Sequence, residues 1–163
     1  MELVATLFTD LPLDARRFLG VLRDLARNGA AGSITPSGLE ARHCFGNPPV
    51  EQDINVIHVR VKPADSAPAS ALRVLHSSGF RAQHAVEFYA DPYGGRDARE
   101  NAWALTHAYA AELCGWVLTC YLNFAQATAR CNRENGLLTL PSDDSDQADA
   151  VLISATTMKL LTP

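Results

Sequence analysis

Residues 97–124 read DARENAWALTHAYAAELCGWVLTCYLNF and carry the strongest fold signal in the chain. Asp97 and Glu100 have the spacing of a helix-capping box, so the segment predicts a helix that begins near Asp97. Gly115 then ends the helix, because glycine readily adopts the left-handed conformation found at helix ends. Residues 116–124 are β-branched and aromatic almost without interruption, which predicts a central strand covered on both faces.

Hydrophobic periodicity predicts the remaining elements on either side of this unit. Alternation of apolar and polar residues is typical of half-buried strands, whereas apolar residues three or four positions apart are typical of amphipathic helices. Residues 125–135 predict a short helix or an irregular crossover, and for 151–161 the pattern leaves strand and helix open. The predicted strands are 2–9, 54–62, 81–90 and 137–140, and the predicted helices are 66–78 and 13–28, the latter capped by Asp10.

Two segments break this periodicity. Residues 30–53 contain Gly, Pro and Ser at short intervals, which predicts a long loop with at most one short strand. A loop of this length in a compact domain is often a binding element. Residues 142–149 carry four aspartates and predict an acidic, solvated loop.

These elements predict one domain over residues 1–163. A chain of 163 residues falls within the usual range of a single domain, about 100–200 residues. Strands outnumber helices, and the helices are spaced too irregularly along the chain for a doubly wound parallel sheet. We therefore expect an α+β fold with a mixed or mainly antiparallel sheet and with helices packed on one face.

The charge balance argues against nucleic acid as a partner. The chain has 14 Lys and Arg against 18 Asp and Glu, a formal net charge of −4 at pH 7. It therefore lacks the excess of positive charge on which general binding to a phosphate backbone depends. No run approaches the roughly 18 apolar residues of a membrane helix, and residues 1–13 lack the basic start of a targeting signal. We expect a cytoplasmic protein that binds neither nucleic acid nor membrane.

The cysteines and histidines do not have the spacings of metal sites. The cysteines form no CxxC pair, which predicts reduced thiols packed as small apolar side chains, and the histidines form no HxH, HxxxH or HExxH pattern. We therefore expect no metal and no cofactor. Adjacent His43 and Cys44 resemble a base and a nucleophile only superficially, because neighbours in an extended segment point in opposite directions. The residues concerned are Cys44, Cys114, Cys120, Cys131, His43, His58, His76, His84 and His107.

One catalytic alternative stays open. His58 and His84 lie on two predicted strands, and if these strands place them side by side they could share a site with Glu87 or Glu112. The chain would then be a small enzyme, for example a transferase, whose site is assembled by the fold. The sequence itself assigns no catalytic residue.

The acidic segment is the predicted partner-binding site. It resembles a calcium-binding loop, but it lacks the central glycine and the glutamate at the twelfth position. An acidic loop of this kind can steer a basic protein partner toward the surface. The predicted partner-binding residues are Asp143, Asp144, Asp146 and Asp149.

Residues 98–124 predict an alanine-rich helix that is ended by a glycine and followed by a hydrophobic strand. In general character this segment resembles one found in small cytosolic immunity proteins of bacterial toxin systems. These proteins share a single α+β domain, an acidic charge balance and no catalytic motif. The resemblance implies a non-catalytic protein-binding protein that neutralises a cognate toxin by covering its active site. The expected partner is a toxin with a basic cleft.

Overall fold

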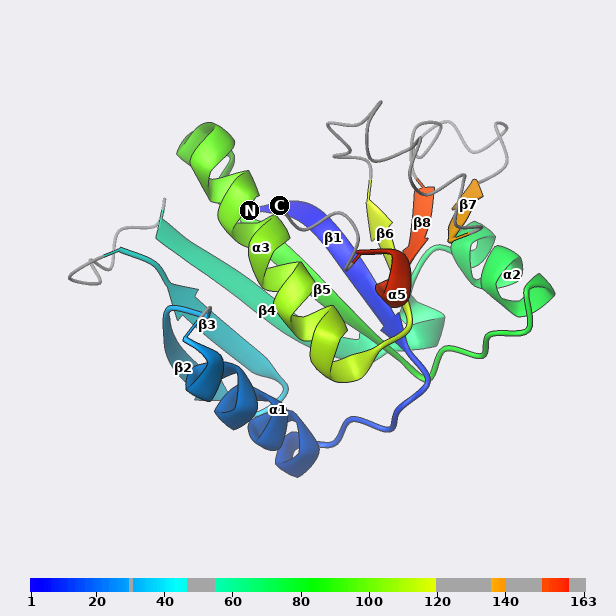
Figure 1. Cartoon of the computed structure of the whole chain (residues 1–163), viewed down its shortest axis with the longest axis horizontal. Helices are drawn as coiled ribbons and strands as arrows, with labels where there is room; N and C mark the ends of the chain where they lie inside the picture. The colour runs from blue at the N-terminus through cyan, green and yellow to red at the C-terminus, as the bar shows by residue number, and fades with distance from the viewer. Residues whose placement is uncertain (30, 47–54, 120–135, 140–150, 159–163) are drawn as a thin grey trace.

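The fold is built on one antiparallel sheet. The computed structural model describes residues 1–29, 31–46, 55–119, 136–139 and 151–158 (Figure 1). Within these residues the strands form an eight-stranded sheet in the order β2-β3-β4-β5-β1-β6-β8-β7, and every neighbouring pair is antiparallel. The strands are β1 (Glu2–Thr9), β2 (Ser33–Ser37), β3 (Glu40–Cys44), β4 (Val56–Pro63), β5 (His84–Ala90), β6 (Trp116–Thr119), β7 (Leu137–Thr139) and β8 (Val151–Ser154).

Helices α1 (Ala15–Asn28) and α3 (Gly95–Leu113) cover one face of the sheet. In Figure 1, α3 runs across β1, β4 and β5, with α1 beside it over β2 and β3. The buried residues of α3 recur every three or four positions, as expected for a helix that packs along one face. The apolar ones belong to the larger core, together with Val59 and Phe88 of the sheet, and are Ala98, Ala102, Leu105, Tyr109, Ala110 and Leu113. The short helix α5 (Ala155–Met158) adds Met158 to this core.

Helix α2 (Ala69–Ser77) packs on the opposite face. Its Ala71 and Leu75 form a second buried cluster with Phe8 of β1, Leu118 of β6 and Leu152 of β8. The immediate neighbours of these three strand residues, such as Leu7 and Val117, belong to the larger core because side chains alternate across a strand. The predicted α+β class and mainly antiparallel sheet are thus confirmed, whereas helices occupy both faces and not one.

The predicted long loop at 30–53 is wrong for its first half, because residues 33–44 form the hairpin β2–β3. Gly38, with φ +60, and Leu39 make its two-residue turn. Proline is typical of loops, but Pro36 is compatible with β2 because β2 is an edge strand of the described sheet. Residues 47–53 lie outside the described part of the chain.

The helix ends also differ from the prediction. Asp14, and not Asp10, caps α1 by accepting a hydrogen bond from Arg17 N at 2.8 Å. Helix α3 begins at Gly95, so Asp97 lies inside its first turn and the predicted capping box does not start the helix.

Gly115 lies where the chain passes from α3 to β6. It has φ +104, and a Cβ at this position would lie 1.9 Å from the carbonyl oxygen of Phe8, so only glycine fits here. Residues 151–158 form β8 and then α5, so both alternatives at 151–161 are realised in turn. The expectations for 120–135 and for the acidic loop at 142–149 fall outside the described residues.

Candidate functional site

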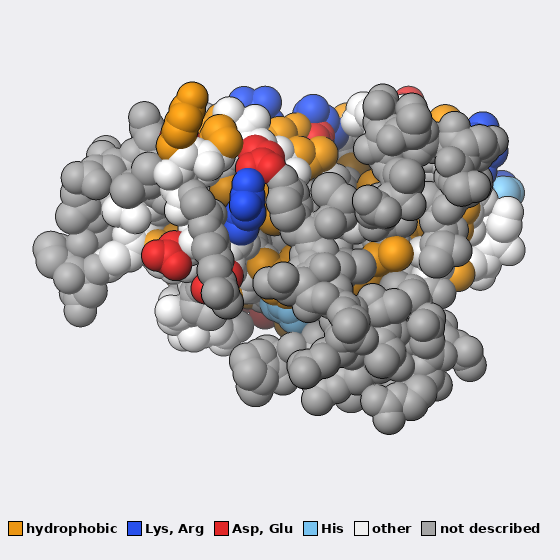
Figure 2. All heavy atoms as spheres, turned by 90° about the horizontal axis from the view of Figure 1, so that it is seen from above, with side chains coloured by type: hydrophobic (Ala, Val, Ile, Leu, Met, Phe, Trp, Pro, Cys, Tyr) orange, Lys and Arg blue, Asp and Glu red, His pale blue; other side chains and the backbone are white. Residues whose placement is uncertain are grey.

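Among the described residues, helices cover only part of the sheet face opposite α1 and α3. Helix α2 packs over β1, β6 and β8, whereas the part formed by β2, β3, β4 and β5 carries polar side chains that are exposed or half-buried. We call this part the open face. Figure 2 shows Lys and Arg side chains, with acidic ones among them, along the rim that lies behind the sheet in Figure 1. The side chains of the open face are Thr35, Ser37, Glu40, Arg42, His58, Arg60, Lys62, Glu87 and Tyr89.

Strand register arranges these side chains in two rows. Arg42, His58 and Tyr89 are direct partners on β3, β4 and β5. Glu40, Arg60 and Glu87 form the next row on the same strands. Directly opposed residues on one face lie about 4.5–5.5 Å apart at their Cβ atoms, so side chains within and between these rows can interact.

Glu87 holds two neighbours in place. Its Oε1 lies 2.7 Å from Lys62 Nζ, and its Oε2 accepts a hydrogen bond from the Tyr89 hydroxyl. The hydrogen bond to Glu87 raises the pKa of Lys62, while burial and then the hydrogen bond to Glu87 raise the pKa of Tyr89. Only 13% of the Glu87 side chain is exposed, against 40% for Lys62, so solvent meets the lysine more than the carboxylate that orients it.

Arg60 lies over this arrangement. Its guanidinium carbon is 5.4 Å from the centre of the Tyr89 ring, within the range of a cation–π interaction. Its Nε is 3.5 Å from Glu40 Oε1, and 48% of the Arg60 side chain is exposed. The open face therefore presents a pattern of charges in which Glu87 orients Lys62, while Glu40 and the Tyr89 ring orient Arg60.

The other face holds a closed polar pair, His43 and Tyr109. His43 Nδ1 lies 2.8 Å from the carbonyl oxygen of Ala31 and must donate to it, so Nε2, at 2.7 Å, accepts from the Tyr109 hydroxyl. Both side chains are fully buried, and burial lowers the pKa of His43 to about 4. Cys44 lies on the opposite side of β3, as alternation requires, so His43 and Cys44 form no catalytic pair. His43 is a neutral structural residue.

The alternative site required His58 and His84 to lie side by side, and the strand register does not place them so. His58 pairs with Tyr89, whereas His84 pairs with Pro63 at the far end of the same two strands. His84 belongs to the helix-covered face, where its Nδ1 lies 3.2 Å from the Leu13 backbone N–H. Glu112 lies on α3, and its carboxylate accepts from Asn28 Nδ2 at 3.4 Å.

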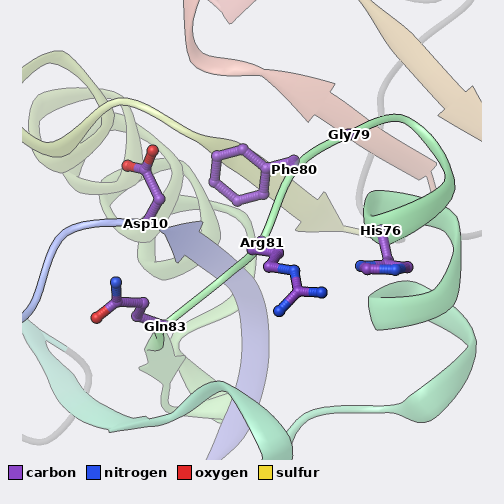
Figure 3. Close-up of a pocket in the computed structure, with 6 residues that line it drawn as sticks. All are labelled: Asp10, His76, Gly79, Phe80, Arg81 and Gln83. Carbon is purple, nitrogen blue, oxygen red and sulfur yellow. The ribbon is translucent and has the colours of Figure 1, made fainter.

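A hollow of about 490 Å³ opens where α2 ends and β1 leaves the sheet. Figure 3 shows Asp10 and Gln83 on one side, His76 on the other and Arg81 between them. Within the described structure, no hydrogen bond or ion pair joins these polar side chains to one another. The hollow is therefore a less organised site than the open face. Its lining residues are Asp10, His76, Gly79, Phe80, Arg81 and Gln83.

The predicted partner-binding residues Asp143, Asp144, Asp146 and Asp149 lie outside the described residues. In the ranges that the structure describes, His, Cys, Asp and Glu side chains nowhere gather in a group of three that could hold a metal ion, and Cys44 and Cys114 form no disulfide bond. The helices in these ranges include none with the length and apolar character needed to span a membrane. Comparisons with protein-family models, with curated proteins and with solved structures found no match to this chain.

Proposed function

We propose that this chain is a non-catalytic protein-binding protein and that the open face of its sheet is a contact surface. The observation that carries this proposal is the cross-strand arrangement of Glu87, Lys62, Tyr89 and Arg60. These side chains restrain one another on rigid strands, so ordering them at an interface costs less conformational entropy than ordering free surface side chains. Tyr and Arg are also the residue types enriched at the energetic centres of protein interfaces.

In its narrower form, the proposal is that the partner is a toxin and that the chain neutralises it by covering its active site. This form is supported by the resemblance of residues 98–124 to immunity proteins and by the net charge of −4. Asp143, Asp144, Asp146 and Asp149 would then supply a second, acidic contact for a basic cleft on the toxin.

Quantitative affinity capture tests the contact surface. Tagged full-length chain is used to capture proteins from the cells that naturally produce it, in parallel with an open-face variant, Arg60→Ser with Lys62→Ser, and a matched control, Arg16→Ser with Arg23→Ser on the exposed side of α1. We expect the parent and the α1 variant to recover one dominant partner and the open-face variant to lose most of it. Equal recovery by both variants would place the contact elsewhere, with the aspartates at 143–149 as the next candidate.

The toxin form of the proposal has its own measurement. The captured protein is expressed alone and together with this chain, and cell growth is followed. We expect the partner alone to arrest growth and the chain to restore it. A partner that leaves growth unchanged would remove the toxin from the proposal while leaving protein binding in place.

A further inference from the structure

We infer that Arg60 is the anchor of the open face and that the partner meets it with a carboxylate of an Asp or Glu side chain. The inference rests on the proposed function and adds the chemistry of the partner. An acidic partner segment would be the counterpart of this face, although the chain as a whole carries a net charge of −4.

The hydrogen-bonding groups of Arg60 are left available by its contacts. The contact with Glu40 is made through Nε at 3.5 Å, and the Tyr89 ring lies against the guanidinium at 5.4 Å. Both contacts orient the planar group, and the contact with Glu40 does not use the two terminal nitrogens. A guanidinium held in this way matches the two oxygens of a carboxylate through paired hydrogen bonds.

The exposed charges of the open face also favour an acidic partner. Arg60 and Lys62 expose 48% and 40% of their side chains, whereas Glu87, which lies between Lys62 and Tyr89, exposes 13%. The face therefore presents its cations outward and keeps one of its two acids beneath them. Tyr89 adds an aromatic surface whose hydroxyl is already satisfied by Glu87.

The second acid of the open face, Glu40, favours a protein carboxylate over a nucleic acid as the group that binds Arg60. Glu40 is exposed over 61% of its side chain and lies beside Arg60. A phosphate backbone carries about one charge for each 1.7 Å of duplex and would bring several charges against Glu40. Side chains of an extended protein segment are about 3.3 Å apart along the chain and point alternately to opposite sides, so one carboxylate can reach Arg60 while its neighbours point away from Glu40.

The test uses the isotope-labelled full-length chain and defined probes. Amide shifts are followed during titration with poly-L-glutamate of about 20 residues, with poly-L-lysine of equal length and with a DNA duplex of about 20 base pairs. The variants are Arg60→Ala, Arg60→Lys, Tyr89→Leu and, as a control on the exposed side of α1, Arg23→Ala. Dispersed amide spectra establish that each variant is folded before its affinity is compared.

We expect poly-L-glutamate to shift amides of β3, β4 and β5 around Arg60. Arg60→Ala should weaken its binding by about tenfold, because a bidentate charge-assisted contact is lost. Arg60→Lys should recover only part of the loss, since lysine keeps the charge but not the fork, and Tyr89→Leu should also weaken binding. Arg23→Ala should bind like the parent.

Three results would overturn the inference: poly-L-glutamate shifts that map away from the open face, equal binding by Arg60→Ala and the parent, or tighter binding of DNA than of poly-L-glutamate at the same face. If one of these results is obtained but capture of a protein partner still depends on the open face, the proposed function stands. Only the inference that the partner binds Arg60 through a carboxylate is then rejected. If poly-L-glutamate binds at Arg60 but no partner is captured through the open face, the carboxylate contact is supported and the proposed function is rejected.

Discussion

Tyr109 and Tyr89 lie on opposite sides of β5, and each donates its hydroxyl to an ionisable side chain. Tyr109 packs against Phe88 from the helix-covered side, with ring centres 5.1 Å apart, and donates to His43. Tyr89, the next residue after Phe88, points to the open face and donates to Glu87. The two pairs are thus nearly the same chemistry placed in two environments.

The environments give the pairs different properties. Around Tyr109 and His43, burial favours the neutral imidazole and seals the pair from any ligand. Around Tyr89 and Glu87, Lys62 and Arg60 remain partly exposed, and the charges stay available to a partner. The comparison indicates that the covered pair stabilises the fold and that the open pair serves recognition.

Truncation of the two tyrosine rings is the strongest test of this division. Tyr109→Ala should lower the free energy of unfolding by about 3–5 kcal/mol, because it leaves a cavity between α3 and the sheet. Tyr89→Ala should lower it by about 1 kcal/mol, since its ring is partly solvated. Urea unfolding of both variants measures the difference, and equal losses would contradict the assignment of separate roles.

Acid should destabilise the covered pair selectively. The folded pKa of His43, about 4, is below its ordinary value of 6.5, so the unfolded chain binds more protons between these values. The free energy of unfolding contributed by His43 is therefore complete above pH 6.5 and falls as the pH drops toward 4, by about 3 kcal/mol in total.

Unfolding of the parent and of His43→Gln across this pH range measures the effect. The difference between the two pH slopes isolates His43 from the carboxyl groups that titrate in the same range. Arg23→Ser on the exposed side of α1 is the control, because it leaves His43 in place and should keep the parental slope. A parental slope in His43→Gln would show that His43 is not the titrating group.

The sequence predicted the elements better than it predicted their contacts. The predicted strand 54–62 is confirmed as β4, in which alternation places Ile57, Val59 and Val61 in the core and His58, Arg60 and Lys62 on the open face. The hairpin of β2 and β3 was missed because Pro36 and Gly38 are typical of loops, and only its position at the edge of the sheet makes Pro36 compatible with a strand.

The site could be predicted only in part, because its geometry depends on register. Glu87 and Tyr89 lie two positions apart in the predicted strand 81–90 and therefore share one side of it, but a shift of one residue between β4 and β5 would separate Tyr89 from Arg60. The bond between His43 and Tyr109 joins residues 66 positions apart, and no local pattern signals it. Long-range pairing therefore fixes both polar pairs, and periodicity alone reveals neither.

Removal of each hydroxyl group sharpens the comparison at the level of single atoms. Tyr109→Phe should lower the free energy of unfolding by about 1–3 kcal/mol, because His43 Nε2 then has no donor inside the core. Tyr89→Phe should change it by no more than about 0.5 kcal/mol, because water can replace the lost donor at Glu87. Paired urea unfolding curves measure both, and a larger loss for Tyr89→Phe would reverse the assignment.

The smallest expected effect on stability concerns Glu87. Glu87→Gln should lower the free energy of unfolding by less than about 1 kcal/mol, because the ion pair with Lys62 is partly exposed and screened by solvent. It should also lower the pKa of Lys62 and the pKa of Tyr89 toward their ordinary values, since Glu87 raises both. The titration of Tyr89 is followed by the phenolate absorbance of Glu87→Gln, with Tyr89→Phe as the reference that lacks this hydroxyl. The titration of Lys62 is followed by nuclear magnetic resonance of its side chain. A large loss of stability with unchanged titrations would mean that Glu87 supports the fold, and the open face would then lose its separate role in recognition.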